Sequence, residues 1–183
     1  LGSDAVLRVE LNGGLAGPTG ALGNDTASAG LGSIGIKGLV IDDWQLEGIY
    51  ISAVTGGHVI AGNFVGVDVS GTLDRGNGRS GVFLTSNNSI IGGTTPADHN
   101  IISGNNLNAG IAVNSQSWTG DNRVQGNFIG LGRDGVTAIG NVGSGLVVGD
   151  INTTVGGTTA GASNVISNNT FAGISVGGFG LDV

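Results

Sequence analysis

Short stretches in which apolar residues alternate with other residues recur along the chain, each directly after a glycine. The pattern Gly-apolar-x-apolar occurs at residues 48–51, 81–84, 110–113, 145–148 and 173–176. Alternation with a period of two is typical of a β-strand that buries one face. We therefore predict five strands whose first apolar residues point inward and stack in one column: Ile49, Val82, Ile111, Leu146 and Ile174.

Longer blocks of sequence repeat at a spacing of 64 residues. GNFVG at residues 62–66 returns as GNFIG at 126–130, and IIGGTTPADHNIISGN from Ile90 returns as TVGGTTAGASNVISNN from Thr154. The glycine-led strands recur at spacings of 33, 29, 35 and 28 residues, so long and short coils alternate. Fixed periods of this length indicate a solenoid, and parallel crossovers are nearly always right-handed. We predict an all-β fold, a right-handed parallel β-helix (a β-solenoid) of about five to six coils of roughly 28–35 residues.

The pattern also predicts how the chain is divided. Residues 1–3 are interpreted as a cloning remnant, and residues 4–183 as a single β-helix segment of a larger protein. Within that segment, residues 4–46 are expected to form irregular N-terminal coils and residues 47–178 the regular repeats. Four asparagines fall at strand ends, where Asn tolerates left-handed backbone and its amide satisfies turn groups. We expect them to stack as a structural turn ladder: Asn63, Asn105, Asn127 and Asn169.

Four sequence blocks resemble a known group of proteins. They are KGLVI from Lys37, GNFVGVDVSGT from Gly62, GGTTPADHNIISGN from Gly92 and GGTTAGASNVISNN from Gly156. They are similar to blocks of bacterial right-handed parallel β-helix repeat proteins, whose fold belongs to the pectate-lyase-like superfamily. The resemblance covers about residues 34–178 and implies a secreted or cell-surface location. It does not identify an activity, because this fold carries many functions.

Composition and charge narrow the classes of function. The net charge of −7 and the sequence pI near 4.3 disfavour nucleic-acid binding. The absence of cysteine excludes disulfides and thiol chemistry. No apolar run reaches the roughly 18 residues of a membrane span, so no membrane insertion is expected. We expect a monomer, or weak end-to-end association through the exposed terminal coils.

Catalytic and metal-binding patterns are weak in this sequence. The outward-facing strand positions carry no ionisable side chain, whereas glycoside hydrolysis needs two carboxylates within about 5–9.5 Å. We therefore expect a protein that is not an enzyme and needs no cofactor. Oxygen-rich loops hold calcium in many proteins, and the weak calcium candidates are Asp42, Asp43, Glu47 and Asp68.

Aromatic residues are the main candidates for ligand binding. Tyr50 and Phe83 are expected to be neighbours on the outward face of adjacent coils, and Trp44 and Trp118 are expected in turns. Aromatic faces stack on sugars, and exposed apolar patches often mark binding surfaces. The leading hypothesis is a non-catalytic structural or adhesive module. The alternatives are a carbohydrate-binding module, with a polysaccharide or cell-surface glycan as partner, and a fragment of a polysaccharide lyase or epimerase.

Overall fold

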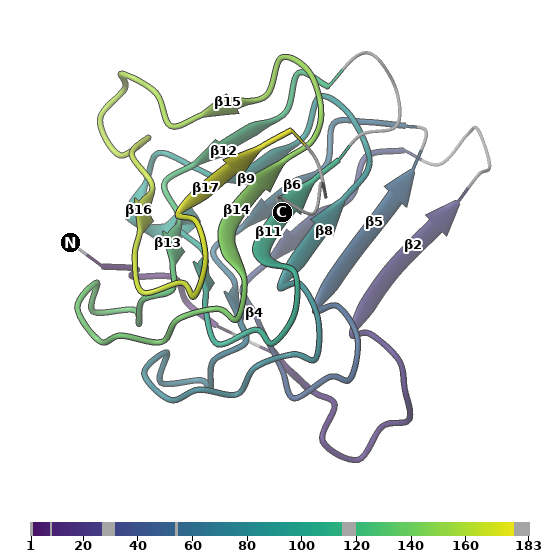
Figure 1. Cartoon of the computed structure of the whole chain (residues 1–183), viewed down its shortest axis with the longest axis vertical. Helices are drawn as coiled ribbons and strands as arrows, with labels where there is room; N and C mark the ends of the chain where they lie inside the picture. The colour runs from purple at the N-terminus through teal and green to yellow at the C-terminus, as the bar shows by residue number, and fades with distance from the viewer. Residues whose placement is uncertain (1, 8, 27–31, 54, 115–119, 178–183) are drawn as a thin grey trace.

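The strands form three parallel sheets, here called A, B and C (Figure 1). The structure is a computed structural model that describes residues 2–7, 9–26, 32–53, 55–114 and 120–177. Sheet A contains β1 (Val9–Asn12), β4 (Leu39–Asp42), β7 (Phe64–Val65), β10 (Ile101–Ile102), β13 (Phe128–Ile129) and β16 (Val165–Ile166). Sheet B contains β2 (Leu22–Thr26), β5 (Ile49–Ala53), β8 (Val82–Leu84), β11 (Ala109–Val113), β14 (Ser144–Val148) and β17 (Ile174–Val176). Sheet C contains β3 (Gly35–Lys37), β6 (Val59–Ala61), β9 (Ile90–Gly92), β12 (Arg123–Gln125) and β15 (Thr154–Val155).

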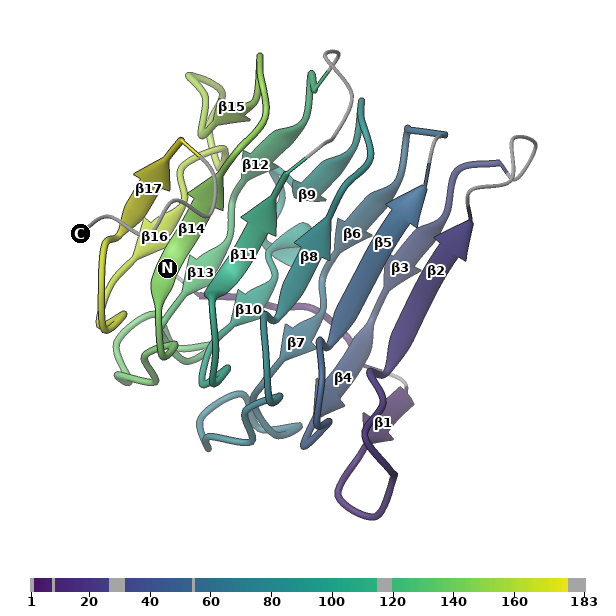
Figure 2. The ribbon, with the colours of Figure 1, turned by 45° about the vertical axis from the view of Figure 1, so that its right-hand side comes forward.

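The chain visits the sheets in the fixed order A, B, C and then begins again, and each pass is called a winding here. Figure 2 shows the strands of successive windings lying side by side along the molecule. Only a short 3₁₀ turn, Pro96–Asp98, interrupts the strands and loops of the described residues. This confirms the predicted all-β class and the parallel stacking of strands, which is consistent with a parallel β-solenoid. Residues 4–46, expected to be irregular, contribute β1 to β4 to the same sheets.

The predicted apolar column is confirmed by the register of sheet B. Its five residues pair in succession: Ile49 with Val82, Val82 with Ile111, Ile111 with Leu146, and Leu146 with Ile174. The first four of these side chains are fully buried in a core shared by the three sheets. Burying an aliphatic side chain of this size contributes about 1.5–3 kcal/mol. The interior is therefore a continuous stack of aliphatic side chains.

Asparagines form a buried ladder where sheet C passes to sheet A. Asn63 donates through Nδ2 to Oδ1 of Asn100 (3.1 Å), Asn100 to Asn127 (2.9 Å) and Asn127 to Asn164 (3.0 Å). The same amides donate to backbone carbonyls of the preceding winding, as Asn127 does to Ile91 (2.9 Å). Such a bond contributes about 1 kcal/mol net, so the ladder fastens each winding to the next.

A second ladder lies where sheet A passes to sheet B. Asn77 donates to Asn105 (2.9 Å), Asn105 to Asn141 (2.9 Å) and Asn141 to Asn169 (2.8 Å). The four asparagines predicted from the sequence all lie in ladders, but in two of them. Asn63 and Asn127 belong to the first ladder, and Asn105 and Asn169 to the second. The reason is that each of these windings carries an asparagine at two corners, one where sheet C passes to sheet A and one where sheet A passes to sheet B.

The second ladder explains why a glycine begins each strand pattern in sheet B. A Cβ atom on Gly81 would lie 2.7 Å from Nδ2 of Asn105, and one on Gly110 would lie 2.7 Å from Nδ2 of Asn141. Real Cβ contacts are not that short, so a larger residue would push the amide out of the ladder. The glycine of the repeated Gly-apolar-x-apolar pattern is thus required by its close contact with a ladder asparagine, and the alternating residues after it form the strand.

The third corner, between sheets B and C, is held by mixed polar side chains. His58 is fully buried and accepts through Nδ1 from the backbone N–H of Ile34 (3.1 Å). The backbone N–H of His58 donates to Oγ of Ser89 (3.2 Å), and that of Ser89 donates to Oδ1 of Asn122 (2.9 Å). His58 therefore occupies the same ladder position as an asparagine two windings later.

The outer face of sheet A is covered by loops and forms a second apolar core. Its strands contribute a buried column consisting of Val40, Phe64, Ile101 and Phe128. Two hairpin loops, residues 66–81 and 130–143, add Val67, Leu131 and Ile139 to this core. The longer windings of the alternating series are the ones that carry these hairpins.

The N-terminal segment, residues 2–7, crosses several windings on the same side of the molecule. Ser3 donates from its backbone to the carbonyl of Arg133 (3.1 Å), and Asp4 to that of Pro96 (3.4 Å). Arg133 donates from Nη2 to the carbonyl of Ser3 (3.2 Å) and lies over the ring of Phe64, 5.6 Å from its centroid. The segment and the second hairpin therefore close the cover over sheet A.

Candidate functional site

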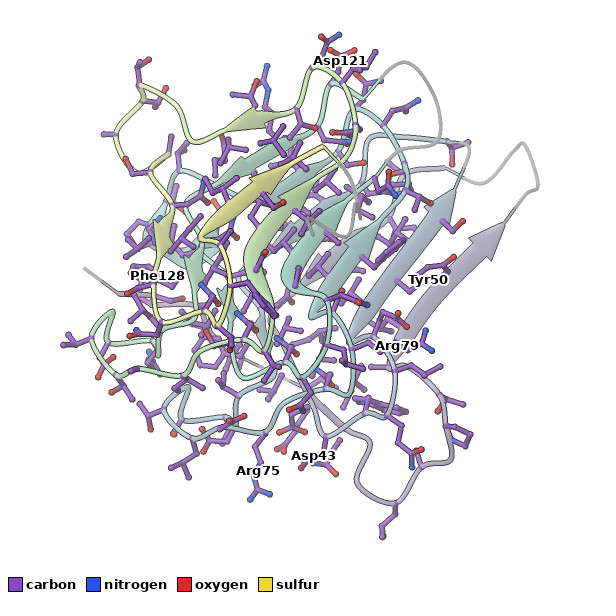
Figure 3. The ribbon with its side chains drawn as sticks, in the orientation of Figure 1. Asp43, Tyr50, Arg75, Arg79, Asp121 and Phe128 are labelled. Carbon is purple, nitrogen blue, oxygen red and sulfur yellow. The ribbon has the colours of Figure 1, made fainter. Side chains whose placement is uncertain are left out.

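A groove of about 470 Å³ lies on the outer face of sheet B, which the hairpins leave uncovered. Strands β5 and β8 form its floor, and the loops at both ends of these strands form its rims. Its lining consists of Glu47, Tyr50, Ser52, Arg79, Phe83, Thr85, Asn108 and Asn114. Figure 3 labels Tyr50 and Arg79 on this side of the molecule.

An aromatic pair forms the apolar part of the groove. Tyr50 and Phe83 are paired residues of neighbouring strands, and their ring centroids lie 5.6 Å apart with the rings tilted by 30°. Both side chains are half-buried, so part of each ring faces solvent. The prediction that they are neighbours on the outward face is confirmed. Such rings offer a flat apolar surface for stacking.

Polar side chains border the aromatic pair on two sides. At the start of the strands, Arg79 forms an ion pair with Glu47 (3.5 Å), in which Glu47 is largely buried and Arg79 half exposed. Toward the end of the strands, Ser52, Thr85 and Asn114 follow the inward residues of β5, β8 and β11. Glu47 is the one carboxylate among the lining residues, so the groove does not contain the pair of carboxylates used in glycoside hydrolysis.

The next two residues of the same outward column are apolar and buried. Ala112 pairs with Phe83 and Val147, as the alternation predicts, but it is 0% exposed and Val147 is 6% exposed. These residues form an apolar cluster with Ala109, and Phe83 packs against it. The groove is therefore confined to the windings of β5, β8 and β11, and the expected outward strip is not open along its whole length.

Of the two tryptophans predicted as ligand-binding residues, the structure describes only Trp44. Trp118 lies outside the described residues. Trp44 is half-buried and packs against the core of the three sheets. Its Nε1 donates to the carbonyl of Leu11 (2.8 Å), and its backbone N–H donates to Oδ1 of Asn77 (3.2 Å). Trp44 therefore takes the place of an asparagine in the second ladder, since Asn77 makes the equivalent bond to the carbonyl of Ile41 (3.2 Å).

Two of the calcium candidates lie at the end of β4. Asp42 is almost fully buried and accepts from Nδ2 of Asn12 (2.8 Å), while Asp43 forms an ion pair with Arg75 (3.6 Å). Burial raises the pKa of Asp42 to about 6, Asn12 opposes the shift by donating to the carboxylate, and the nearby charges of Glu10 and Asp43 add to it. With this pKa the carboxyl group of Asp42 is still mostly ionised near neutral pH.

The other two calcium candidates, Glu47 and Asp68, interact with other groups of the protein. Glu47 pairs with Arg79 in the groove. Asp68 lies in the first hairpin, where its Oδ1 accepts from Oγ of Ser70 (2.7 Å) and from the backbone N–H of Leu73 (3.1 Å). These bonds lower the pKa of Asp68 against the opposing effect of burial. Among the residues that the structure describes, no three His, Cys, Asp or Glu side chains are grouped so that they could hold a metal ion. Calcium binding stays a prediction.

Sequence patterns did not reveal two of the lining residues. Arg79 and Asn108 lie in loops of unequal length, so neither belongs to the repeated strand pattern, whereas Asn114 follows its strand at the outward position expected from the alternation. A signal was present for Arg79: it lies two residues before the glycine that begins the pattern at residues 81–84, close to where Glu47 lies before the pattern at 48–51. Register across neighbouring windings brings these two positions together.

Comparisons with known proteins add no relative of this chain. No family model matches it, and neither the curated proteins nor the solved structures contain a match. In the described part of the chain, no helix is long and apolar enough to cross a membrane.

Proposed function

We propose that this chain is a non-catalytic structural or adhesive module, a right-handed parallel β-helix that serves as a rigid element of a secreted or cell-surface bacterial protein. The observation that carries the proposal is the pair of buried asparagine ladders, each running through four windings. Ladders of this kind resist separation of the windings along the axis, because a winding cannot leave without breaking several buried hydrogen bonds.

The resemblance to bacterial β-helix repeat proteins supports the location and the handedness. The right-handed preference of parallel crossovers supports the handedness independently. The predominantly acidic charge is compatible with a soluble, exposed rod, since net charge far from zero opposes association.

Single-molecule stretching tests the structural role. We expect the module to unfold winding by winding, with force peaks that decrease when Asn105 is replaced by alanine. The matched control is Asn106→Ala, an exposed neighbour whose side chain makes one bond to the carbonyl of Asn77 (3.2 Å). Unfolding at low force with no effect of Asn105→Ala would contradict a mechanical function for the ladders. Adhesion itself is tested by coating beads with the module and measuring their retention on bacterial and host cell surfaces.

A second candidate function is carbohydrate binding in the groove on sheet B. The specific observation that favours it is the Tyr50–Phe83 pair flanked by polar rims. A sugar ring has an apolar face for stacking and hydroxyl groups at its edge, so a flat aromatic floor with hydrogen-bonding borders complements it. The partner would be a polysaccharide or a cell-surface glycan.

Affinity electrophoresis through gels containing neutral and acidic polysaccharides tests this second function. Retardation by one of them should be lost in Tyr50→Ala. The matched control is Phe171→Ala, which removes an aromatic ring that is 77% exposed and lies outside the groove. No retardation with any polysaccharide, or equal retardation of the two variants, would reject glycan binding in this groove.

The third candidate, a fragment of a polysaccharide lyase or epimerase, stays a prediction from the resemblance. Incubation with a panel of uronate polymers tests it, since lyase products contain a new double bond that absorbs in the ultraviolet.

A further inference from the structure

The chain contains the sequence Asn-x-Ser/Thr, which is the acceptor pattern for N-linked glycans. The asparagines in this pattern are Asn24, Asn87, Asn152 and Asn168. The pattern alone does not select a site, because the acceptor amide and the hydroxyl group two residues later must both reach an external enzyme. The side chain of Asn24 lies outside the described residues. For the other three, the fold determines whether both groups are accessible.

Asn152 lies in the turn between β14 and β15, at the corner where sheet B passes to sheet C. The register of sheet C places Asp121 and Asn88 at the same position of the two preceding windings. All three residues have a left-handed backbone, with φ of 58°, 49° and 49°, and all three are exposed. Figure 3 labels Asp121 at this corner. Exposure at this position is therefore a property of the corner in inner windings as well, and it does not depend on where the described chain stops.

The hydroxyl residue of this pattern, Thr154, faces outward too. It begins β15 and pairs with Arg123 of β12, which is exposed although β12 has a neighbouring strand on each side. Among the described residues, the side chains of Asn152 and Thr154 have no hydrogen-bond partner. The acceptor amide and its hydroxyl group are therefore both presented to solvent.

An aspartate fixes the shape of this turn from its inner side. Oδ1 of Asp150 accepts from Oγ1 of Thr153 (2.6 Å), and Oδ2 accepts from Nδ2 of Asn122 (2.8 Å). Thr153, the middle residue of the pattern, therefore takes part in the corner, where it occupies the position of the buried Asn122. The residues on either side of it are left pointing outward.

The pattern at Asn87 has the opposite arrangement, because it is shifted by one residue relative to the corner. Its hydroxyl residue, Ser89, is 1% exposed. Oγ of Ser89 accepts from the backbone N–H of His58 (3.2 Å) and donates to the carbonyl of Asn87 (2.9 Å). An external enzyme cannot reach this hydroxyl group while the windings are stacked.

The pattern at Asn168 is occupied by bonds to the preceding winding. Nδ2 of Asn168 donates to the carbonyl of Gly130 (3.4 Å), and Oγ1 of Thr170 donates to that of Asn141 (3.2 Å). The same position one 64-residue repeat earlier is Gly104, which is buried. A Cβ atom there would lie 2.2 Å from Oδ1 of Asp74 in the first hairpin. This position is therefore closed in an inner winding, unlike that of Asn152.

We propose that Asn152 is an acceptor site for an N-linked glycan, which an oligosaccharyltransferase adds to the folded module. The inference rests on the proposed secreted or cell-surface location, since exported chains receive such glycans. In the transfer, Nδ2 of Asn152 forms a bond to C1 of the first sugar of a lipid-linked oligosaccharide. The bond between C1 and the diphosphate oxygen breaks, the lipid diphosphate leaves with the electron pair, and one Nδ2 proton passes to a base of the transferase.

Transfer in vitro to the folded protein tests the site. The protein is incubated with a lipid-linked oligosaccharide and a single-subunit oligosaccharyltransferase that requires only Asn-x-Ser/Thr. Intact-mass spectrometry should show the added mass of the oligosaccharide, and peptide mapping should locate it on Asn152. Asn152→Gln and Thr154→Val should each abolish transfer at this site, Thr154→Ser should retain it, and the matched control Asn168→Gln should leave it unchanged.

Short synthetic peptides separate the effect of the fold from that of the local sequence. Peptides centred on Asn87, Asn152 and Asn168 should all be accepted, because nothing buries their amides or hydroxyl groups. An Asn152 that remains unmodified in the folded protein, or folded protein modified at Asn87 or Asn168 to the same extent as at Asn152, would overturn the inference. The reaction needs neither export nor mechanical load, so these outcomes are independent of the stretching and adhesion experiments.

Discussion

The outer faces of sheets A and B are built from the same kind of strand, but loops bury the outer face of sheet A and leave part of that of sheet B exposed. On sheet A, Phe64 is 0% exposed because the hairpins and the N-terminal segment lie over it. On sheet B, Phe83 occupies a comparable outward position and remains half-buried, with its ring contributing to a groove. The comparison teaches that the strands determine which side chains point outward, whereas the loops determine which of them face solvent. An open groove remains where no loop covers the sheet.

The largest expected effect separates the two phenylalanines. Phe64→Ala should lower the free energy of unfolding by about 3–5 kcal/mol, because it removes a fully buried ring from a close-packed core. Phe83→Ala should cost less than half as much, since part of its ring is already in water. Urea denaturation of the two variants measures the difference. Equal losses would mean that the face of sheet B is as well covered as that of sheet A.

The ladder between the two faces should give the next largest effect. Asn105→Ala leaves the amides and backbone groups of adjacent windings without partners, which costs about 1–3 kcal/mol. Asn106→Ala, at an exposed position, should change stability by less than about 0.5 kcal/mol. Thermal or urea unfolding distinguishes them. A neutral Asn105→Ala would show that the ladder follows the stacking of windings and does not stabilise it.

Two arginines on the two faces provide a finer comparison. Arg133→Ala removes a bond to Ser3 and a contact with the ring of Phe64, so it should cost about 1 kcal/mol and speed hydrogen exchange in residues 2–7. Arg79→Ala removes a half-exposed ion pair worth about 0.2–1 kcal/mol or less. Hydrogen exchange followed by mass spectrometry measures the N-terminal segment directly. Unchanged exchange in Arg133→Ala would show that Arg133 does not hold the N-terminal segment over sheet A.

A further comparison, between two aspartates, concerns pH. Because the pKa of Asp42 is raised to about 6, the folded state binds more protons than the unfolded state between about pH 4 and 6. Stability should therefore fall as pH rises through this window, and the cost should be complete above about pH 6. Asp42→Asn should raise the melting temperature near neutral pH and have little effect below about pH 4.

Asp134 gives the matching control with the opposite sign. Hydrogen bonds from Thr137 and the nearby backbone lower its pKa to about 2. Its contribution is present above the ordinary pKa of an aspartate and is lost as the pH falls toward about 2. Asp134→Asn should therefore lower the melting temperature near neutral pH. Identical pH profiles for the two variants would contradict the assignment of Asp42 as a carboxyl group that burial disfavours.

The asparagine ladders show which features could be predicted from the sequence and which could not. The repeats identified Asn63, Asn105, Asn127 and Asn169 as stacked turn residues, and all four lie in ladders. The repeats did not separate the two corners, because each winding from residue 63 onward carries an asparagine at both of them, and a spacing of 64 residues relates only every second winding. Asn77, Asn100, Asn141 and Asn164 complete the ladders, and only the register of the sheets places them there.

The candidate groove shows the same division. Tyr50 and Phe83 were predictable as neighbours because strand alternation and repeat spacing determine both direction and column. The contribution of Arg79 and Asn108 to the groove was not predictable, because these residues lie in loops that do not follow the repeat. The burial of Ala112 was equally unpredictable, since alternation specifies the face of a sheet and says nothing about what packs against it.

The amino-acid sequence by itself determined the positions of the five glycine-led strands, the inward column and the alternation of long and short windings, because these depend on local periodicity and on its spacing along the chain. Tertiary structure decided which corner each asparagine occupies, which outer face is covered and which side chains meet in the groove. Those features depend on contacts between residues about 30 or more positions apart, and such contacts exist only after the windings have stacked.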